Sequence, residues 1–561
     1  AEMMGPGGAL IDFDGDGDLD VYLPQGLVLD RRATAADLVD GPPRHAPPFA
    51  HRAYRNDLVD GRPRFVDVTN EAGLAALPPV YGVAVAAGDV DHDGRIDLYV
   101  ANFGGNRLLR NRPGPAGFRF VDATGDSPGL DDPRWSVGAT FVDVDRDGWL
   151  DLYVVNYVDH SVDRHVLCPS PAGGREYCGP LAYRPIGDRL FRNRGGDDPA
   201  RAGTFEDVSL AAGVAAVAPG TGLGVVAADL DQDGWLDLYV ANDEMSNHFL
   251  RHRGKPAETP WLIDDAVFAG VAVSGEGARE SSMGVAAADV DDDGDLDLFL
   301  THLNGQTNTL YRNEGEGFFR DVSEPSGAGL PSWNQTGFGT GFFDLEHDGD
   351  LDLVAVNGAV RLFDTAAATD GDDRLAPGSV RALAQPDLLL RNEGGGRFAP
   401  LDDPASAAPV LAAPAVGRGL AFGDVDNDGD VDFLRVDCGA PARLVRNRAA
   451  DGAPWLGVRL LEASGRDALG ATVALVDPAR PDALRSGVRR IATDGSYASA
   501  SDPRAVLVPR AGGPQAVRIV WPDGAVEVRR GLAPGQYHTL RRADATPARG
   551  ASPSAEPSGR P

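Results

Sequence analysis

The chain has 561 residues and a formal net charge of −32 at pH 7, with 84 Asp and Glu residues against 52 Lys and Arg residues. This length allows more than one domain, and so acidic a composition argues against a nucleic-acid partner. No apolar run reaches the roughly 18 residues that a membrane-spanning helix needs, so we expect no membrane span.

From the N-terminus onward, short apolar runs alternate with acidic loops of one pattern, Asp-x-Asp-x-Asp-Gly-x-Leu/Ile/Val-Asp. The loops begin at Asp12, Asp89, Asp143, Asp229, Asp289, Asp344 and Asp424. The flanking runs, such as residues 82–87 and 98–101 around the second loop, are short and rich in Val, Ala, Leu and Tyr. This composition favours buried strands over helices. The repeating unit is therefore predicted to be strand, acidic loop, strand.

Each loop has acidic side chains at positions 1, 3, 5 and 9, and Gly at position 6 permits a sharp turn. This spacing can wrap oxygen ligands around one hard cation such as Ca²⁺. We predict up to seven calcium sites, in which the position-7 residue contributes its backbone carbonyl. The predicted ligands are Asp12, Asp14, Asp16, Asp18, Asp20, Asp89, Asp91, Asp93, Arg95, Asp97, Asp143, Asp145, Asp147, Trp149, Asp151, Asp229, Asp231, Asp233, Trp235, Asp237, Asp289, Asp291, Asp293, Asp295, Asp297, Asp344, Glu346, Asp348, Asp350, Asp352, Asp424, Asp426, Asp428, Asp430 and Asp432. Glu346 replaces the usual Asp, so we expect the sixth site to be atypical.

The EF-hand shares the first half of this pattern but requires a Glu at position 12 and flanking helices. Position 12 is here Leu23, Val100, Val154, Val240, Leu300, Ala355 or Arg435, none of which binds a metal. An acidic turn without a metal is the alternative for any single loop, but seven copies favour metal binding. Two carboxylates about 4 Å apart repel by roughly 4 kcal/mol at an effective dielectric near 20, so metal and stability should be coupled.

Two further motifs complete the repeating unit. An Arg-Asn pair, as at residues 110–111, follows most loops, and a Phe-x-Asp motif, as at residues 120–122, often comes next. Each unit thus supplies four strands. Loop starts lie 54 to 86 residues apart, with insertions at 24–51, 156–188 and 357–386. This spacing suits one propeller blade per unit, and we predict an all-β fold in which residues 1–451 form a seven-bladed β-propeller.

The three cysteines lie outside the loops. Cys168 and Cys178 are ten residues apart in a Pro- and Gly-rich stretch. We predict a disulfide between them, with two reduced thiols as the alternative. Cys438 is expected to be a small buried residue.

A polar residue follows the last Asp of every loop by five positions: Gln25, Asn102, Asn156, Asn242, His302, Asn357 and Asp437. These residues should lie at the end of each blade opposite the metal. They either cap turns or form a polar ring that faces a ligand. Trp135, Trp333, Asn334 and Gln335, just ahead of two inner strands, are candidates for the same ligand face. At position 4 of two loops, His92 and His347 are expected to point to solvent.

The acidic loops stop after residue 432. Residues 452–542 hold thirteen Arg against eight acidic residues and alternate like an antiparallel β module. The Ala-, Pro- and Ser-rich residues 543–561 are expected to form a disordered tail. Because the chain starts at Ala1, almost inside the first repeat, we take it as one whose signal peptide is removed or absent.

The repeats resemble the FG-GAP (VCBS) family of calcium-loop blades found in integrin α-chain heads. The C-terminal module resembles the ASPIC/UnbV domain through residues 469–473, 494–497 and 520–524. This combination resembles the cartilage acidic protein family along nearly the whole chain. The resemblance implies a secreted, calcium-binding, interacting protein and supplies no established reaction. Residues 506–509 depart from the domain's usual sequence. The chain also lacks the strands expected before the first loop, so we expect imperfect ring closure.

These patterns favour an extracellular, cell-surface or periplasmic protein that binds calcium and acts in binding or adhesion. Loops of this kind suit millimolar calcium. The partner would be an unknown extracellular protein or glycan. No serine-hydrolase, Walker or zinc-protease motif is present, which favours a role without catalysis. The alternative is a calcium-dependent polysaccharide lyase or hydrolase acting on acidic glycans, because calcium-bearing propellers include such enzymes.

Overall fold

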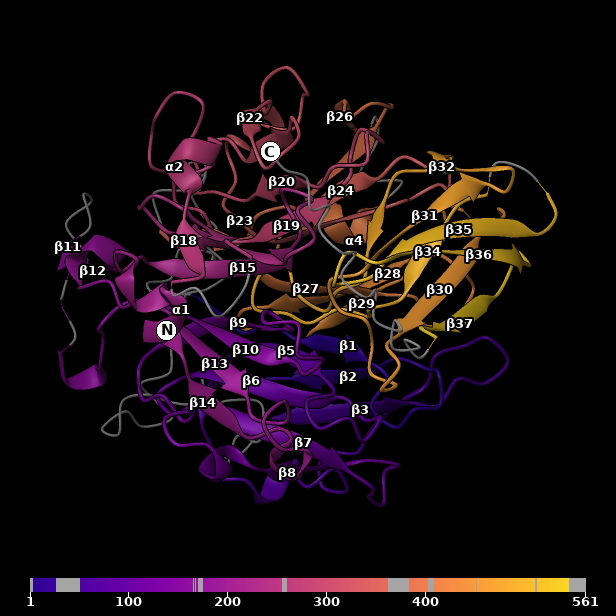
Figure 1. The fold of residues 1–561 in the computed structure, drawn as a ribbon. Coiled ribbons are helices and arrows are strands. Elements are labelled where there is room, and N and C mark those ends of the chain that lie inside the picture. The colour runs from indigo at the N-terminus through magenta and orange to yellow at the C-terminus, as the bar shows by residue number, and fades with distance from the viewer. Residues whose placement is uncertain are drawn as a thin grey trace, which may run out of the picture.

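The computed structural model describes residues 4–26, 51–164, 166, 168–169, 175–254, 260–361, 383–401, 408–450, 452–509 and 512–543. The fold is all-β, as the sequence predicts, with single-turn helices in the connections. No described helix is long and apolar enough to cross a membrane. One antiparallel sheet forms around each acidic loop (Figure 1).

The sheets follow one another along the chain and are numbered here in that order. Sheet 1 contains β1 (Ala9–Ile11), β2 (Asp20–Leu23), β3 (Arg52–Asn56) and β4 (Phe65–Asp67). Sheet 2 contains β5 (Tyr81–Gly88), β6 (Asp97–Phe103), β7 (Arg107–Arg112) and β8 (Arg119–Asp122). Sheet 3 contains β9 (Ser136–Val142), β10 (Asp151–Asn156), β13 (Arg189–Asn193) and β14 (Phe205–Asp207). Sheet 4 contains β15 (Gly222–Ala228), β16 (Asp237–Asn242), β17 (His248–His252) and β18 (Leu262–Asp264).

The remaining sheets of this part repeat the same order. Sheet 5 contains β19 (Val285–Ala288), β20 (Asp297–Leu300), β21 (Thr309–Asn313) and β22 (Phe319–Asp321). Sheet 6 contains β23 (Gly337–Phe343), β24 (Asp352–Asn357), β25 (Leu388–Asn392) and β26 (Phe398–Pro400). Sheet 7 has three strands in the described residues, β27 (Gly417–Gly423), β28 (Asp432–Asp437) and β29 (Arg443–Val445).

Short helices occupy the connections. They are η1 (Leu74–Ala76), η2 (Thr124–Asp126), η3 (Val162–Arg164), η4 (Pro180–Ala182), η5 (Pro199–Arg201), η6 (Val214–Ala216), η7 (Leu330–Ser332), α1 (Ser209–Ala212), α2 (Ala266–Ala269) and α4 (Pro409–Ala412). The insertion of sheet 3 also holds a hairpin of β11 (Cys168–Pro169) and β12 (Arg175–Glu176). A disulfide joins Cys168 to Cys178 with their Cα atoms 5.3 Å apart, so the predicted pairing is confirmed. Cys438 is half-buried against the small cluster around Val416.

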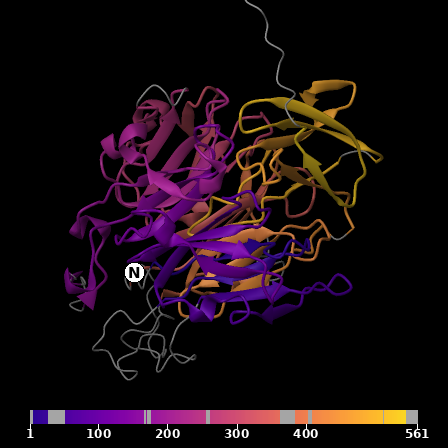
Figure 2. The ribbon, with the colours of Figure 1, turned by 60° about the horizontal axis from the view of Figure 1, so that its bottom comes forward.

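The first strand of each sheet is innermost and contacts the first strands of both neighbouring sheets. β5 contacts β1 and β9, β15 contacts β9 and β19, and β23 contacts β19 and β27. Because β27 also contacts β1, the sheets close into a ring, seen from two directions in Figures 1 and 2. The expected imperfection of closure is therefore wrong, since β1 supplies a strand before the first loop. The blade number of seven stays a prediction, with which these sheets agree.

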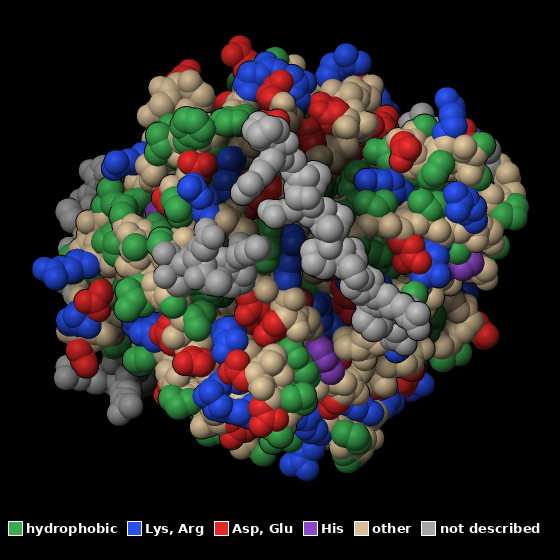
Figure 3. All heavy atoms as spheres, in the orientation of Figure 1, with side chains coloured by type: hydrophobic (Ala, Val, Ile, Leu, Met, Phe, Trp, Pro, Cys, Tyr) green, Lys and Arg blue, Asp and Glu red, His purple; other side chains and the backbone are tan. Residues whose placement is uncertain are grey.

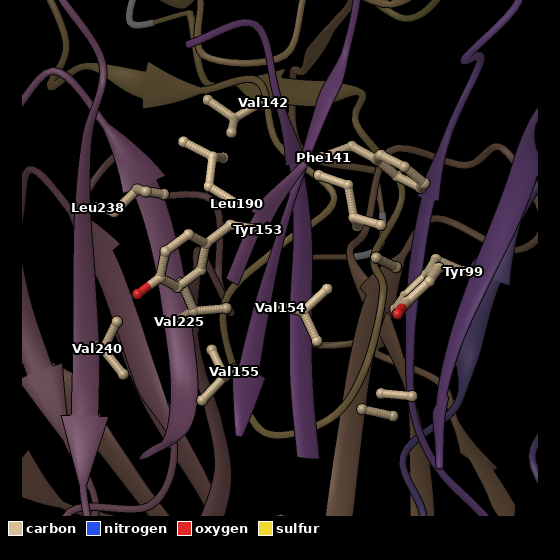
Figure 4. Packing of buried hydrophobic residues seen from close by; sticks show 14 of the residues in the cluster. Tyr99, Phe141, Val142, Tyr153, Val154, Val155, Leu190, Val225, Leu238 and Val240 are labelled. Atoms are coloured by element: carbon tan, nitrogen blue, oxygen red, sulfur yellow. The ribbon is translucent and has the colours of Figure 1, made fainter. Parts of the chain in front are cut away.

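Apolar side chains fill the space between neighbouring sheets, because alternate residues of a strand point to opposite faces. In β10, Tyr153 lies on the side of Val225 of sheet 4, whereas Val154 lies on the side of Tyr99 of sheet 2 (Figure 4). All of these side chains are buried. The core is thus divided into layers between the sheets, and each layer depends on two of them.

In six of the seven units, one Asn residue ties the third strand to the sheet before it. The Asn313 N–H donates to Asp297 Oδ1 at 2.8 Å, and Asn313 Nδ2 donates to the Leu230 carbonyl of sheet 4 at 2.8 Å. Asn56 makes the same contact with the Val425 carbonyl of sheet 7 at 3.0 Å and so helps to close the ring. The Asn residues with this contact are Asn56, Asn111, Asn193, Asn313, Asn392 and Asn447.

The C-terminal module is formed by two sheets, β34-β30-β37 and β32-β31-β35-β36, with β33 paired to β31. Its strands are β30 (Leu456–Leu461), β31 (Thr472–Asp477), β32 (Arg480–Leu484), β33 (Arg489–Arg490), β34 (Ala505–Leu507), β35 (Gln515–Val520), β36 (Val526–Leu532) and β37 (Tyr537–Arg541). The module is drawn in orange to yellow at one side of the ring (Figures 1 and 2). Leu456, Val517 and Trp521 belong to its own buried cluster.

A segment of this module, residues 493–502 between β33 and β34, enters the centre of the ring; we call it the central segment. Its hydrogen bonds reach the first strand of every sheet, at Leu10, Val85, Thr140, Ala227, Val285, Thr340 and Phe422. Asp494 Oδ2 accepts from Thr140 Oγ1 at 2.8 Å and from the Ala227 N–H at 2.9 Å. The buried Tyr497 hydroxyl donates to the Met4 carbonyl at 3.0 Å. The inner strands therefore close around a piece of the C-terminal module.

Replacing the inter-sheet Asn should cost stability. We expect Asn313→Ala to lower the free energy of unfolding by about 1–3 kcal/mol, because the buried Leu230 carbonyl loses a donor. The exposed Arg320→Ala change in the same sheet is the control, with an effect within about 0.5 kcal/mol. Urea unfolding in calcium measures both, and equal effects of the two variants would show that the Asn contact carries no stability.

Candidate metal centres

The acidic loops share one backbone conformation. The position-6 Gly has φ between 81° and 105° in all seven loops, a region that only Gly adopts at no steric cost. Position 4 is also left-handed, and in six loops it carries a side chain, with φ between 55° and 62°. These two positions fold each loop back on itself and turn its carboxylates inward.

The loops gather their carboxylates as the spacing predicts. In the first five loops, carboxylate oxygens of three Asp residues lie within 4.8 Å of one another. The groups are Asp12 with Asp14 and Asp20, Asp89 with Asp91 and Asp97, Asp143 with Asp145 and Asp151, Asp229 with Asp231 and Asp237, and Asp289 with Asp291 and Asp293. Oxygen clusters of this kind suit a hard cation. The position-7 carbonyl ligands and the ion count stay predictions.

Hydrogen bonds fix part of each cluster and leave the rest open. The position-1 Asp accepts from the N–H of the position-6 Gly through Oδ2 at 2.8–3.1 Å. Several other acidic oxygens at positions 1 and 3 are buried without a hydrogen-bond partner: Oδ1 of Asp14, Asp91, Asp143, Asp229, Asp289, Asp291 and Asp426, and Oε2 of Glu346. Buried acceptors without a donor are unusual in folded proteins. A calcium ion would satisfy them, so the residues present fit this ion.

The position-9 Asp joins the loop to the third strand. In loop two, Asp97 Oδ1 accepts from the Asn111 N–H at 2.7 Å, and Asp97 Oδ2 accepts from the Val90 N–H at 3.2 Å. The same pair of bonds recurs in every loop, with His252 in place of Asn in loop four. In six units this residue therefore links the acidic loop to the strand that carries the inter-sheet Asn.

Burial away from water raises the pKa of these carboxyl groups when no ion balances their charge. It raises the pKa of Asp20, Asp297, Asp352 and Asp432 to about 8. Burial also raises the pKa of Asp143, Asp229 and Asp289 at position 1 to about 7. Neighbouring carboxylates add to several of these shifts, whereas a divalent cation favours the ionised form. The protons and the cation therefore compete for the same oxygens.

Neighbouring loops touch through positions that the sequence analysis assigned to solvent. His92, at position 4 of loop two, stacks on Trp149 of loop three with ring centroids 3.7 Å apart. His347 Nε2 lies 3.4 Å from Asp430 Oδ1 of loop seven, and its side chain is buried. The expectation that these His side chains point to solvent is therefore wrong. In both of these pairs of neighbouring loops, position 4 of one loop meets position 7 of the next.

The C-terminal module rests on the acidic loops. Arg466 Nη2 donates to Asp143 Oδ2 at 2.8 Å, and the Tyr537 hydroxyl donates to Asp424 Oδ2 at 2.9 Å. The Val488 N–H donates to Asp289 Oδ2 at 2.9 Å, and Arg489 Nη2 donates to the Gly349 carbonyl at 2.9 Å. Sequence reasoning missed these contacts, and the one signal for them was the excess of Arg in residues 452–542. The C-terminal module therefore covers part of this end of the ring.

The opposite end carries the other predicted site residues. Trp135 is only 6% exposed and packs edge-on against Phe103 and Tyr157, so it is part of the core and not a ligand surface. Trp333 is 49% exposed, and Asn334 is exposed next to it. Gln335 is half-buried, and its Oε1 accepts from Asn357 Nδ2 at 3.1 Å.

The polar residues that follow the loops cap turns. Asn102 Nδ2 donates to the Gly105 carbonyl at 2.8 Å, and Asn242 Nδ2 donates to the Ser246 carbonyl at 2.9 Å. His302 Nδ1 and the Thr307 carbonyl are 2.8 Å apart. All three side chains are buried. Of the two interpretations that the sequence left open, these contacts favour turn capping over a ligand-facing ring.

Comparison with known families agrees with the motifs. The FG-GAP-like repeat matches residues 89–154, 229–300 and 289–355, and the domain described as ASPIC and UnbV matches residues 461–547. Cartilage acidic protein 1 of Homo sapiens is 26% identical over 540 residues, which cover 85% of this chain and 74% of that protein. The Mus musculus protein is 26% identical over 545 residues, 85% of this chain and 76% of that protein. The chain thus carries FG-GAP repeats followed by an ASPIC/UnbV domain.

Several solved structures show a distant likeness. A lectin of Agrocybe aegerita that recognises non-reducing terminal N-acetylglucosamine is 13% identical, with 71% of this chain and 88% of that chain covered and a TM-score of 0.36. The Dos1 propeller is 8% identical, with 79% and 95% covered and a TM-score of 0.32. The rhamnogalacturonan lyase YesW is 13% identical, with 80% and 61% covered and a TM-score of 0.31. At these TM-scores, the ligands of those proteins have no bearing on this chain.

Removing calcium should destabilise the protein. One site saturated 100-fold above its Kd contributes about 2.7 kcal/mol, so stripping several sites should lower the melting temperature by more than about 5 °C. Differential scanning calorimetry with excess chelator, then with calcium or magnesium added back, measures this. Magnesium should restore less, because it demands octahedral geometry. An unchanged melting temperature in chelator would contradict a structural role for the metal.

The metal-free protein should lose stability as pH rises. The folded-state pKa of Asp20 and Asp297 lies near 8, well above about 3.9 in the unfolded chain. The folded state therefore holds more protons, and its advantage disappears as pH rises from about 4 through 8. The urea midpoint of metal-free protein should be lower at pH 8 than at pH 5, whereas calcium should remove this loss. A higher midpoint at pH 8 without calcium would contradict the burial of these carboxyl groups.

Proposed function

We propose that this chain is an extracellular calcium-loaded propeller that binds a partner through the end of the ring opposite the metal loops. The observation that carries the proposal is that the C-terminal module covers part of the end of the ring where the acidic loops lie. The C-terminal module bonds to loops three, five, six and seven there, through Arg466, Val488, Arg489 and Tyr537. The metal ions would then act on binding only indirectly, by holding the strands and the module in place.

The topology supports the choice of the opposite end. The first strand of each sheet runs toward its acidic loop and the second strand runs away from it, so the connections between second and third strands gather at the far end. Loops on a rigid scaffold are common binding elements. The insertion of sheet 3 exposes Leu181 by 61% and Tyr177 by 46%. The connection into β23 exposes Leu330 by 74% and Trp333 by 49%.

The charge distribution agrees with this division of roles. Twenty-eight of the 84 acidic side chains lie at positions 1, 3, 5 and 9 of the seven loops. On the face seen in Figure 3, acidic and basic side chains are interspersed and do not gather by sign. Much of the net negative charge is thus committed to the metal sites. A partner at the far end would be recognised by aromatic and apolar side chains together with short-range polar contacts.

Three observations support the proposed extracellular compartment. The protein contains the Cys168–Cys178 disulfide. Disulfides persist in oxidising surroundings and are rare in cytosolic proteins. Calcium loops without a bidentate Glu suit the millimolar calcium of extracellular fluid. The similarity to cartilage acidic protein 1 over 85% of the chain points the same way. No feature of the described residues favours the glycan-cleaving alternative over binding.

Variants at the far end should separate binding from stability. We expect Trp333→Ala and Asn334→Ala to weaken binding to whatever a calcium-containing panel of glycans and extracellular proteins identifies, at an unchanged melting temperature. Phe268→Ala is the matched control, because Phe268 is 71% exposed but packs against Phe318 of the turn before β22, and the neighbouring Gly317 of that turn lies next to Asp231 of the fourth acidic loop. Biolayer interferometry measures the affinities. Intact binding by both far-end variants, together with loss of binding in Trp149→Ala, would place the partner at the wrong end for this proposal.

A further inference from the structure

Sheet 7 ends one strand short. In the six other sheets a fourth strand pairs with the third, whereas in the described residues no strand pairs with the outer side of β29. After Asn447 the chain turns at Ala449, as it does in the other sheets, and then leaves for β30 of the C-terminal module. The outer backbone groups of β29 therefore form an open sheet edge, which is a template for another strand.

β29 keeps the register of a complete third strand. Val445 pairs with Phe433 as Leu109 pairs with Leu98 in sheet 2. The Asn447 N–H donates to Asp432 Oδ1 at 2.7 Å, and Asn447 Nδ2 donates to the Leu345 carbonyl of sheet 6 at 3.0 Å. The third strand of sheet 7 thus has the same register and the same Asn contacts as the third strands that pair with a fourth strand in the other sheets.

The fourth strands of the other sheets share a recognisable chemistry. Each has a Phe or Leu opposite the inter-sheet Asn or His, and five of the six carry Asp two residues later. These strands are Phe65–Asp67, Arg119–Asp122, Phe205–Asp207, Leu262–Asp264, Phe319–Asp321 and Phe398–Pro400. In the first three sheets, this Asp pairs with the Arg that begins the third strand, at 3.4, 2.9 and 2.8 Å.

Sheet 7 keeps the partner for such an Asp. Its third strand also begins with an Arg, Arg443, whose side chain is 41% exposed. Arg443 lies 3.9 Å from Asp437 Oδ2, but Asp437 is already paired with the buried Arg435 at 2.8 Å. In the first three sheets, the corresponding Arg52, Arg107 and Arg189 side chains are 34%, 13% and 33% exposed, and each pairs with the Asp of its fourth strand. Arg435 is also shared with Asp387 at 2.7 Å, so Arg443 helps to balance the charge of Asp437. The ion pair of Arg443 is long and its side chain is exposed, which leaves room for a second carboxylate.

An apolar position is open beside this edge as well. The Phe or Leu of each fourth strand packs into the same cluster as position 2 of the preceding acidic loop, as Phe319 does with Leu230 and Phe398 with Val290. Position 2 is buried in six loops and only half-buried at Leu345, in the loop that precedes sheet 7. Leu444 and Val445 are also half-buried, although their counterparts Leu310 and Tyr311 are buried. Apolar surface is therefore uncovered where the missing strand would place its first side chain.

We propose that the outer edge of β29 binds an extended segment of a partner protein by β-strand addition, with the pattern apolar residue, any residue, Asp. The segment would run antiparallel to β29, with its apolar residue opposite Asn447 and over Leu345. Its Asp would lie opposite Val445 and pair with Arg443. Main-chain hydrogen bonds would supply affinity, and the two side chains would supply specificity. This site lies on the rim of the ring and does not depend on the function proposed for its far end.

The probe is a peptide that copies the chain's own fourth strand of sheet 2, residues 117–124, labelled with fluorescein. Fluorescence polarisation with the calcium-loaded full chain should show saturable binding. Arg443→Glu should weaken this binding at least tenfold, and a peptide with Lys in place of its Asp should recover binding to that variant. A peptide with Ala in place of the Phe opposite Asn447 should bind more weakly. Arg391→Glu is the matched control on the covered third strand of sheet 6 and should leave binding unchanged.

Three results would overturn the proposal. The first is no binding of the peptide at millimolar chain, which would mean that the edge is already occupied or unsuited. The second is binding that Arg443→Glu and the charge swap leave unchanged, which would place the peptide elsewhere. The third is a dimer of this chain that the peptide dissociates and Arg443→Glu abolishes, because the occupant would then be a second copy. Melting temperatures of the variants in calcium show whether Arg443→Glu remains folded.

Discussion

Unbalanced negative charge buried beside the inner strands is the constraint on which the rest of this molecule depends. The position-9 carboxylates receive backbone hydrogen bonds from their loop and from the third strand, and they need ionised oxygens for full strength. Burial alone would leave Asp20 or Asp432 protonated near neutral pH. A cation in each loop would remove this conflict. Calcium, in this account, is what makes the hydrogen-bonded framework of the sheets compatible with a folded ring at physiological pH.

From that framework the contacts spread in two directions. Outward, in six units the position-9 Asp accepts a hydrogen bond from the N–H of the Asn whose side chain reaches the preceding sheet, so one loop influences the interface between two sheets. Inward, Arg residues and Tyr537 of the C-terminal module form hydrogen bonds to the acidic loops. Residues 493–502 of the module enter the centre of the ring. Ser496 and Ala498 join opposite parts of the ring through Val285 and Val85. The propeller and the module are therefore one cooperative structure in which neither has a complete surface alone.

The sequence predicted those features that are local in the chain. The clustering of the loop carboxylates, the strand-loop-strand unit and the Cys168–Cys178 bridge all depend on residues a few positions apart. The Arg-Asn motif was visible in the sequence, but its structural role was not, because the Asn313 side chain donates a hydrogen bond to Leu230, which lies 83 residues earlier in the chain. Residues 494–497 were recognisable only as part of a domain signature, since their role in the ring needs all seven inner strands. Trp135 and His347 were misjudged for the same reason: Phe103, Tyr157 and Asp430 surround them only in three dimensions.

The central claim is that the acidic loops are calcium sites that hold the ring and the module together. Hydrogen exchange measured by mass spectrometry, on the full chain in millimolar calcium and after removal of metal, tests it most directly. The account predicts that protection falls together in the acidic loops and at the amides of residues 496–500, although these residues contain no metal ligand. Loss of protection confined to the loops, with residues 496–500 unchanged, would contradict it.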